Sequence, residues 1–209
     1  DILMSKIKGL KTFKNRTFFV GNESKFPQGC HSCLFGTGLN AIRKTNKCNM
    51  ECKFCYDYGE LENIPPVGEG MWEIGGTRFY DKDIDLLLSI QKKPTGICYV
   101  YLEPFMEIEK YYPVIRKFSD AQVHQHLYTN GILATEETLK ALGEAGLDEI
   151  RFNLGASNCS DKVIENIRIA KKYIKNVGIE TPMTPELFKA FFKKQQAILE
   201  TKLDFINCA

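Results

Sequence analysis

Cys48-Asn-Met-Glu-Cys52-Lys-Phe-Cys55 places three cysteines within eight residues and is the most informative stretch of this 209-residue chain. Three closely spaced thiolates can bind a metal cluster and leave one metal position open to another ligand. Buried packing on one face of a helix is the alternative, and it is disfavoured because charged residues stand between the cysteines. On a helix, Cys48 and Cys55 would also lie about 10 Å apart along the axis. The pattern therefore predicts a loop wrapped around a metal site.

The composition is that of one globular domain with a substantial core, at 44% hydrophobic and 26% charged residues. The net charge of +2 comes from 28 basic and 26 acidic residues that are well mixed, so we do not expect nucleic acid or a membrane as partner. No apolar stretch is long enough for a bilayer, and no signal peptide is visible, which predicts a cytoplasmic protein. Five of the eight cysteines precede residue 56, a clustering that favours metal ligation over disulfides.

From residue 39 onward, short β-rich segments alternate with amphipathic helical segments, which is typical of parallel βαβ units. Thr135 and Thr184-Pro185 are predicted to begin helices, and Gly146 to end one. We expect strands near residues 39–45, 96–102, 123–128, 149–154, 176–181 and 205–208. We expect helices near residues 82–92, 107–119, 135–145, 160–174 and 184–199.

The predicted fold class is α/β, a partial TIM-like (β/α)6 barrel of parallel strands that stops at its sixth strand. Residues 1–38 are expected to form an N-terminal extension with a Cys-x2-Cys knuckle, and residues 39–209 the partial barrel. Thr17–Val20 is expected to be an edge strand, and residues 59–81 a loop or small hairpin. Because no helix follows the last strand, we expect further chain beyond residue 209.

At this point a resemblance becomes specific. Cys48-x3-Cys52-x2-Cys55, with Phe54 and Tyr56 around the last cysteine and a strand just before the loop, resembles the signature of the radical S-adenosylmethionine (radical SAM) superfamily. The resemblance implies a [4Fe–4S] cluster ligated by the three cysteines, with S-adenosylmethionine bound to the fourth iron through its amino and carboxylate groups. It also implies reductive cleavage of the sulfonium by an electron from a donor such as ferredoxin or flavodoxin, and hydrogen abstraction by a 5′-deoxyadenosyl radical.

Further segments match the family in part. Tyr101-Leu102-Glu103-Pro104 stands where relatives usually have Gly-Gly-Glu-Pro, and the resemblance implies that Glu103 accepts from the cofactor's ammonium. The two glycines are missing, and Val177–Glu180 likewise departs from the glycine-rich motif of the fifth strand. The residues that the resemblance implies for cofactor binding are Phe54, Tyr56, Glu103, Asn130, Asn153, Ser157 and Arg168.

Strand alternation supports a separate expectation about the interior. If Glu103 faces the lumen, Tyr99 and Tyr101 face it too, and Cys98 and Val100 face the helices. The same alternation turns inward a polar set on the next two strands: His124, His126, Tyr128, Arg151 and Asn153. A lumen of this kind predicts a polar chamber for a small polar molecule or a peptide, although each histidine could equally be a satisfied core residue.

Cys30 and Cys33 form a second pair with Cys-x2-Cys spacing. Such a pair can supply half of a zinc site, a redox couple or part of a second cluster, or can consist of plain thiols. Tyr101, His124, His126, Tyr128, Arg151, Cys30 and Cys33 are therefore candidates for binding substrate or a second metal.

Two functions remain open from the sequence. The first is a radical SAM enzyme acting on a polar small molecule or a peptide. The alternative is a non-catalytic zinc-binding or iron–sulfur electron-transfer module, in which Cys30 and Cys33 join two or three cysteines of the 48–55 loop.

Overall fold

The structure is a computed structural model that describes residues 6–13, 17–34, 39–90 and 96–208. Its centre is a mixed sheet of eight strands in the order β10-β9-β8-β7-β6-β3-β4-β5. Six of these strands run parallel: β3 (Leu39–Arg43), β6 (Gly96–Tyr99), β7 (Gln125–Thr129), β8 (Glu149–Phe152), β9 (Asn176–Thr181) and β10 (Phe205–Cys208). All six were predicted from the sequence. The α/β fold is therefore confirmed, and the parallel part of the sheet is consistent with a partial barrel.

The sheet is not purely parallel, which corrects the expected all-parallel order. Residues 59–81 include the hairpin β4 (Met71–Ile74) and β5 (Thr77–Tyr80), and β4 pairs antiparallel with β3. Ion pairs fix this hairpin to β3: Arg43 pairs with Glu73 at 2.7 Å, and Lys44 pairs with Asp81 at 2.7 Å. The hairpin and β10 are the two outer edges of the sheet, and no strand pairing within the described ranges closes it into a barrel.

Six α-helices occur among the described residues: α1 (Gln28–Leu34), α2 (Ile84–Ile90), α3 (Tyr112–Asp120), α4 (Glu136–Ala145), α5 (Asp161–Ala170) and α6 (Pro185–Glu200). The last two residues of the helix expected at 82–92 lie outside the described residues. Thr135 and Thr184 cap α4 and α6 as predicted, since each hydroxyl accepts a backbone N–H of the first turn. Gly146 ends α4 with a φ of 94°. None of the described helices has the length and apolar character that a bilayer crossing requires.

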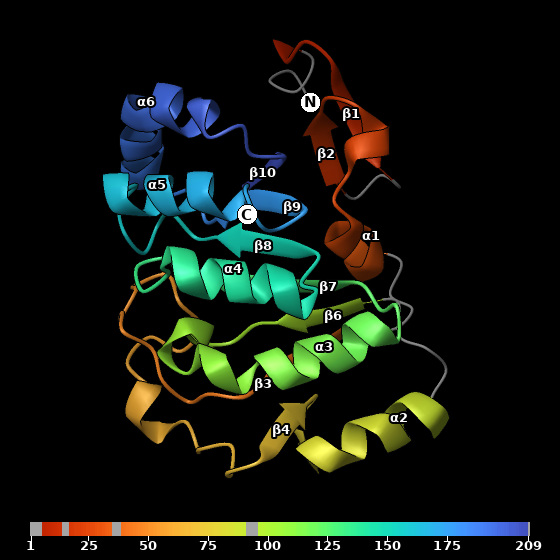
Figure 1. The fold of residues 1–209 in the computed structure, drawn as a ribbon. Coiled ribbons are helices and arrows are strands. Elements are labelled where there is room, and N and C mark those ends of the chain that lie inside the picture. The colour runs from red at the N-terminus through yellow and green to blue at the C-terminus, as the bar shows by residue number, and fades with distance from the viewer. Residues whose placement is uncertain (1–5, 14–16, 35–38, 91–95, 209) are drawn as a thin grey trace.

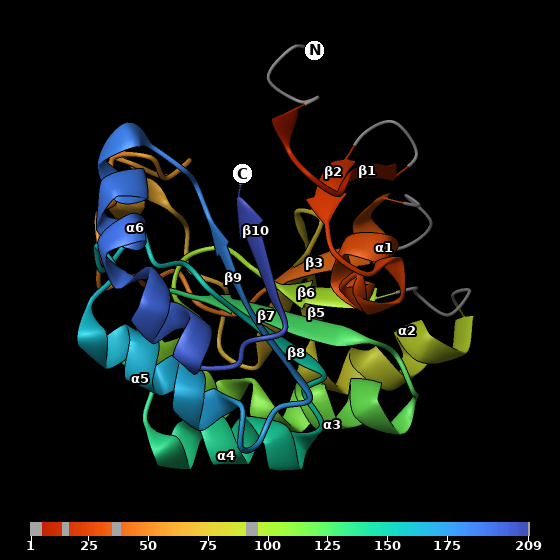
Figure 2. The same cartoon turned by 90° about the horizontal axis from the view of Figure 1, so that it is seen from above.

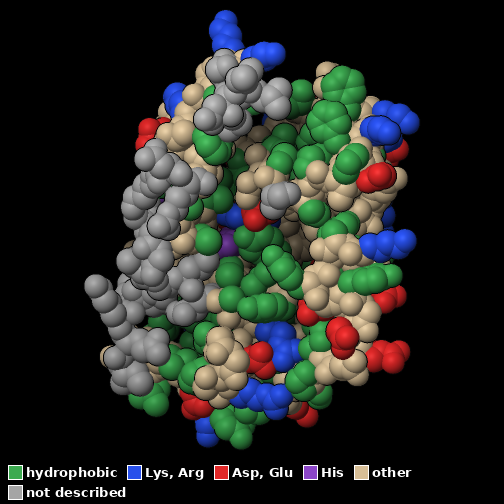
Figure 3. All heavy atoms as spheres, turned by 180° about the vertical axis from the view of Figure 1, so that it is seen from behind, with side chains coloured by type: hydrophobic (Ala, Val, Ile, Leu, Met, Phe, Trp, Pro, Cys, Tyr) green, Lys and Arg blue, Asp and Glu red, His purple; other side chains and the backbone are tan. Residues whose placement is uncertain are grey.

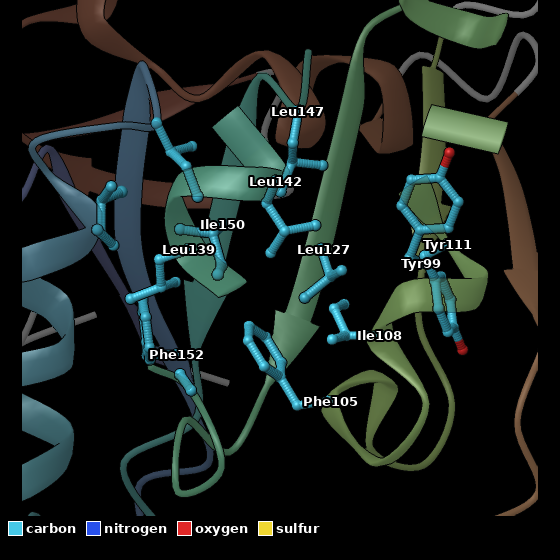
Figure 4. Packing of buried hydrophobic residues seen from close by; sticks show 14 of the residues in the cluster. Tyr99, Phe105, Ile108, Tyr111, Leu127, Leu139, Leu142, Leu147, Ile150 and Phe152 are labelled. Carbon is cyan, nitrogen blue, oxygen red and sulfur yellow. The ribbon is translucent and has the colours of Figure 1, made fainter. Parts of the chain in front are cut away.

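Helices α3, α4 and α5 cover one face of the sheet, and α1 lies on the opposite face (Figures 1 and 2). The main hydrophobic core lies between the sheet and helices α3, α4 and α5. Leu127 and Ile150 are adjacent strand positions that meet Leu139 and Leu142 of α4, and all four are fully buried (Figure 4). Burial of this continuous apolar face is the main stabilising contribution to the sheet–helix layer.

Residues before β3 form a small unit beside the sheet. β1 (Leu10–Phe13) and β2 (Thr17–Val20) pair only with each other among the described residues, in an antiparallel two-stranded sheet. Thr17–Val20 is therefore a strand, as expected, but it does not lie at the edge of the main sheet. Phe26 and His31 pack edge-to-face at 5.1 Å, which links α1 to this unit.

The side chains of β6 point to the opposite faces from those expected, because a strained turn separates the strand from Glu103. Tyr99 stands opposite Leu127 in the register, its hydroxyl lies 2.6 Å from Oε1 of Gln125, and its ring packs on Tyr111 (Figure 4). Tyr99 thus faces the helices, while Cys98 shares the opposite face with His126. Alternation counted backward from Glu103 fails here. The strand ends at Tyr99, and the backbone then turns through two residues with positive φ.

That turn consists of Tyr101 (φ 76°) and Leu102 (φ 58°). A side chain in the left-handed region costs roughly 1–3 kcal/mol. The turn that leads to Glu103 is therefore strained at two non-glycine residues.

Replacing Tyr101 by glycine should relieve this strain. We expect Tyr101→Gly to raise the free energy of unfolding by up to about 1 kcal/mol, because the strain removed exceeds the added freedom of the unfolded chain. Tyr80→Gly is the matched control, since Tyr80 is 52% exposed against 50% for Tyr101 but has a φ of −81°. The control should lose about 1 kcal/mol in the same urea titration. Equal losses in both variants would contradict the strain at residue 101.

Candidate functional site

The three cysteines lie in an irregular loop that follows the carboxyl end of β3, as expected. Cys48 and Cys52 are partly buried, and Cys55 is exposed. Tight turns shape the loop: the N–H of Cys55 donates to the carbonyl of Cys52 at 2.8 Å, and the N–H of Tyr58 donates to the carbonyl of Cys55 at 3.2 Å. The backbone therefore wraps around the thiols.

The thiols of this loop lie close enough to influence one another. Burial raises the pKa of Cys52, and the charges of Cys48 and Cys55 raise it further. Burial likewise raises the pKa of Cys48, with smaller contributions from Glu103 and Cys55. Thiolates that disfavour one another's charge are stabilised together by a shared cationic centre. This donor set fits an iron–sulfur cluster held by three cysteines.

The Glu103 carboxylate is fully buried beside this loop and binds the carboxyl end of β7. Its Oε1 accepts from the N–H of Phe105 at 3.0 Å and from the hydroxyl of Thr129 at 2.7 Å, and its Oε2 accepts from the N–H of Asn130 at 2.7 Å. Burial raises the pKa of Glu103 to about 7, although the three hydrogen bonds act in the opposite direction. Glu103 thus holds the turn after β6 against the end of β7.

Two further hydrogen bonds connect the cysteine loop to this cluster. The backbone N–H of Glu103 donates to the carbonyl of Lys47, the residue before Cys48, at 3.1 Å. The side-chain amide of Asn130 donates to Oδ1 of Asn49, the residue after Cys48, at 2.7 Å. Cys48 is therefore anchored on both sides.

A carboxylate on the other side of the loop fixes its first residues. Glu107 accepts from the hydroxyl of Thr45 at 2.7 Å and forms ion pairs with Lys47 and Lys110 at 3.1 and 2.6 Å. Burial alone would raise the pKa of Glu107, but the hydrogen bonds from Lys110, Thr45 and Lys47 lower it to about 2. The segment between β3 and Cys48 is consequently held by an ionised group.

The end of β8 completes this edge of the sheet. Oδ1 of Asn153 accepts from the N–H of Gly155 at 2.9 Å and from the hydroxyl of Thr181 at 3.1 Å. A side chain at Gly155 would approach Cζ of Phe54 to 3.0 Å, so the Phe54 ring packs directly over this glycine. The structure therefore brings Phe54, Glu103, Asn130 and Asn153 to the edge that carries the cysteine loop.

The other predicted residues differ in their placement. Ser157 is in the loop before α5, where its hydroxyl donates to the carbonyl of Leu154 at 3.4 Å. Tyr56 is fully exposed, and Tyr101 is half exposed. Arg168 lies in the last turn of α5, exposed and paired with Glu165, and is not brought to the cysteine loop.

A polar cluster occupies the face of the sheet opposite α3 and α4, as the alternation predicted for His124, His126, Tyr128 and Arg151. Arg151 is at its centre and pairs with both Glu149 and Glu180. The Arg151 guanidinium also donates to the hydroxyl of Tyr128 at 3.0 Å. The His124 and His126 rings stack at 5.7 Å, and burial with the nearby Arg151 lowers the pKa of His126 to about 2.

Cys30 and Cys33, on α1, belong to this second face. Arg151 lies 3.4 Å from Sγ of Cys30, and the charge of Cys33 acts on Cys98 in the middle of β6. Both cysteines line a cavity of about 720 Å³ whose wall also includes Tyr128 and Arg151. The cavity therefore combines polar groups with the apolar rings of the N-terminal unit.

Several of these contacts were not predicted from the sequence. Glu149 shares a face with Arg151 two residues later, so strand alternation could have revealed it. Thr129, Asn49 and Glu107 carried no signal, because their roles arise from contacts over 26, 81 and 62 residues of sequence.

The sequence is also similar to known proteins. The model of the radical SAM superfamily matches residues 42–190, which includes the cysteine loop and every strand from β6 to β9. The chain belongs to the radical SAM superfamily. The superfamily typically uses a [4Fe–4S] cluster and S-adenosylmethionine, in agreement with the three-thiolate loop.

Two relatives come from Methanocaldococcus jannaschii. One carries the provisional name of a glycyl-radical enzyme activating enzyme and is 30% identical over 187 residues, which are 85% of this chain and 48% of the relative. The other is an uncharacterized protein, 25% identical over 174 residues, which are 73% of this chain and 53% of the relative. The chain thus spans about half the length of these relatives.

Removing the Glu103 carboxylate should weaken this edge of the sheet. We expect Glu103→Ala to lower the free energy of unfolding by roughly 2–5 kcal/mol, because three donors lose their acceptor. Glu103→Gln, which keeps one acceptor oxygen, should lose less. The exposed Glu109→Ala is the control and should change stability by about 0.5 kcal/mol or less. Urea unfolding of the metal-free protein measures all three variants. Equal losses of stability at residues 103 and 109 would rule out a stabilising role for the Glu103 hydrogen bonds.

Proposed function

We propose that this chain is the cluster-bearing part of a radical SAM enzyme that cleaves S-adenosylmethionine reductively and abstracts hydrogen from a substrate. The observation that carries the proposal is the loop of three thiols at the carboxyl edge of the sheet, anchored on both sides of Cys48. When bound, the cluster and S-adenosylmethionine supply one-electron cleavage of a carbon–sulfur bond. The protein's own part is to hold, orient and shield these groups.

Named residues take specific parts in this proposal. Cys48, Cys52 and Cys55 are the cluster ligands. Oε2 of Glu103 accepts one hydrogen bond among the described residues, and a carboxylate oxygen can accept a second, so it is suited to the cofactor's ammonium. Asn130 and Asn153 add polar groups at the same edge, and Phe54 packs between the loop and Gly155.

The proposal for the substrate class is supported by the name of one relative rather than by the fold. We propose that the hydrogen donor is a glycine in a partner polypeptide, as the name of the first relative suggests for that protein. The electron would come from a low-potential donor of the ferredoxin or flavodoxin class.

A closed five-cysteine metal site is not favoured by the arrangement. The Cys30–Cys33 pair packs on the sheet beside Arg151, whereas the cysteine loop lies beyond the carboxyl end of β3. Within the described part of the chain, no cysteine belongs to a group of three potential ligand atoms within 4.8 Å of one another. Thiols that each bind a different iron of a cluster do not need to converge so closely.

Substitution of the three loop cysteines tests the cluster assignment. We expect Cys48→Ala, Cys52→Ala and Cys55→Ala each to abolish release of 5′-deoxyadenosine after anaerobic cluster reconstitution, because each removes one of three ligands. Cys208→Ala removes an exposed thiol on β10 and should retain cleavage. Cleavage that survives in any of the three loop variants would refute the ligand set.

Deuterium transfer tests the proposed partner. A glycyl-radical enzyme from the same genome, labelled with α-deuterated glycine, should lose one C–D bond per turnover. The deuterium should appear in the methyl group of 5′-deoxyadenosine, and a glycine-centred radical should be detected by EPR. A polypeptide with glycine replaced by alanine at the radical position is the control. Cleavage with no deuterium transfer would exclude the glycine substrate while leaving the cluster assignment intact.

A further inference from the structure

Three buried polar atoms belong to neighbouring side chains at the amino edge of the sheet, away from the cysteine loop. They are Nε2 of His124, Nδ1 of His126 and Oε2 of Glu149, and each has no hydrogen-bond partner among the residues that the structure describes. His124 precedes β7, and Glu149 is the first residue of β8, opposite His126 in the register. We propose that these three side chains bind a divalent transition-metal ion of the zinc class, at a site distinct from the cysteine loop.

The geometry supports a common ligand. One potential ligand atom from each of the three residues lies within 4.8 Å of the other two, and Nε2 of His124 is 4.0 Å from Oε2 of Glu149. These separations are too long for direct hydrogen bonds, and they exceed the roughly 3.4 Å between two ligands of a tetrahedral zinc ion, so the side chains must move inward to share one ion. Because zinc–nitrogen bonds are about 2.0–2.1 Å long, small side-chain rotations would complete the coordination.

Burial explains why a ligand is needed here. Glu149 and His126 are at most 1% exposed, so bulk solvent does not reach their polar atoms. A buried polar atom with no partner costs about 1–3 kcal/mol, and the three atoms lie together rather than scattered through the core. One metal ion satisfies all three at once.

The surroundings resemble the outer shell of a metal site. Arg151 donates from Nε and Nη2 to Oε1 of Glu149 at 2.6 and 2.5 Å, which fixes the carboxylate and leaves Oε2 free. Oδ2 of Asp148 lies 3.7 Å from Nδ1 of His124, on the side of the ring away from Glu149. Carboxylates at this position commonly orient a ligating histidine.

The local charge also suits a cation. Asp148, Glu149 and Glu180 contribute three negative charges around the histidines, and Arg151 and Lys175 contribute two positive charges. The formal sum is −1. The net charge favours a divalent ion, while Arg151 beside His126 acts against one.

Helix α1 covers this cluster at very short range. A Cβ at Gly29 would come within 2.8 Å of Nδ1 of His126 and 3.0 Å of Oε1 of Glu149, so only glycine allows this approach. Figure 3 shows histidine at the base of a hollow on this face, beside acidic and basic side chains. Two imidazoles and one carboxylate are a ligand set typical of zinc and of non-haem iron. Because the amino ends of parallel strands usually serve stability rather than catalysis, we assign the ion a role in holding β7 and β8 together beneath α1.

Zinc binding by the cluster-loaded protein tests the site, because the loop thiols are then occupied. The wild-type protein should retain one equivalent of zinc after dialysis, measured by elemental analysis, and should melt at a higher temperature with zinc than without it. His124→Gln should lose the zinc and the shift in melting temperature. His31→Gln, which removes the histidine on α1, and Cys30→Ala should retain both.

Zinc X-ray absorption of the wild-type protein identifies the ligands without any substitution. We expect two imidazoles and oxygen, with no sulfur in the coordination shell. Sulfur scattering, or zinc retained by His124→Gln but lost from Cys30→Ala, would overturn the site in favour of the cysteine pair. A wild-type protein that binds no zinc would overturn it in favour of a buried water molecule bridging the three atoms.

Discussion

The Glu103 carboxylate is the contact on which the arrangement of the carboxyl edge depends. It joins the turn after β6 to the end of β7, and its own backbone holds the residue before Cys48. A carboxylate can do this because it offers several acceptor positions in a small volume, and burial makes the loss of any partner expensive. The strained residues Tyr101 and Leu102 bring it into place, so strain in the backbone is balanced by hydrogen bonding of the side chain.

The two faces of the sheet have separate tasks. Leu127, Ile150 and the core that they share with α4 stabilise the fold and carry no reactive group. The opposite face carries Arg151, its acidic partners and the histidines, with α1 packed over them. Along the strands, the cysteine loop lies at the carboxyl ends and the histidine cluster at the amino ends. The proposed cluster site and the proposed metal site can therefore share β7 and β8 without sharing a residue.

The sequence predicted what depends on short-range pattern. The six parallel strands, five of the helices and the cysteine loop follow from alternation, caps and spacing. Alternation failed at Tyr99 because two left-handed residues interrupt the strand before Glu103, and a residue count across such a turn has no physical meaning. The β4–β5 hairpin was placed on the sheet by ion pairs with β3, about 30 residues away, and pairing at that range leaves no local signal. The contacts of Asn49 and Thr129 also join distant parts of the sequence, so the sequence alone did not predict them.

The central claim is that the three-cysteine loop holds a cluster with one iron open to S-adenosylmethionine. Electron–nuclear double resonance of the reduced cluster, with the cofactor labelled with ¹⁵N in its amino group and ¹⁷O in its carboxylate, tests this claim most directly. We expect hyperfine coupling from both labels, because both groups bind the same iron. A cluster spectrum that shows neither coupling and does not change when the cofactor is added would contradict it.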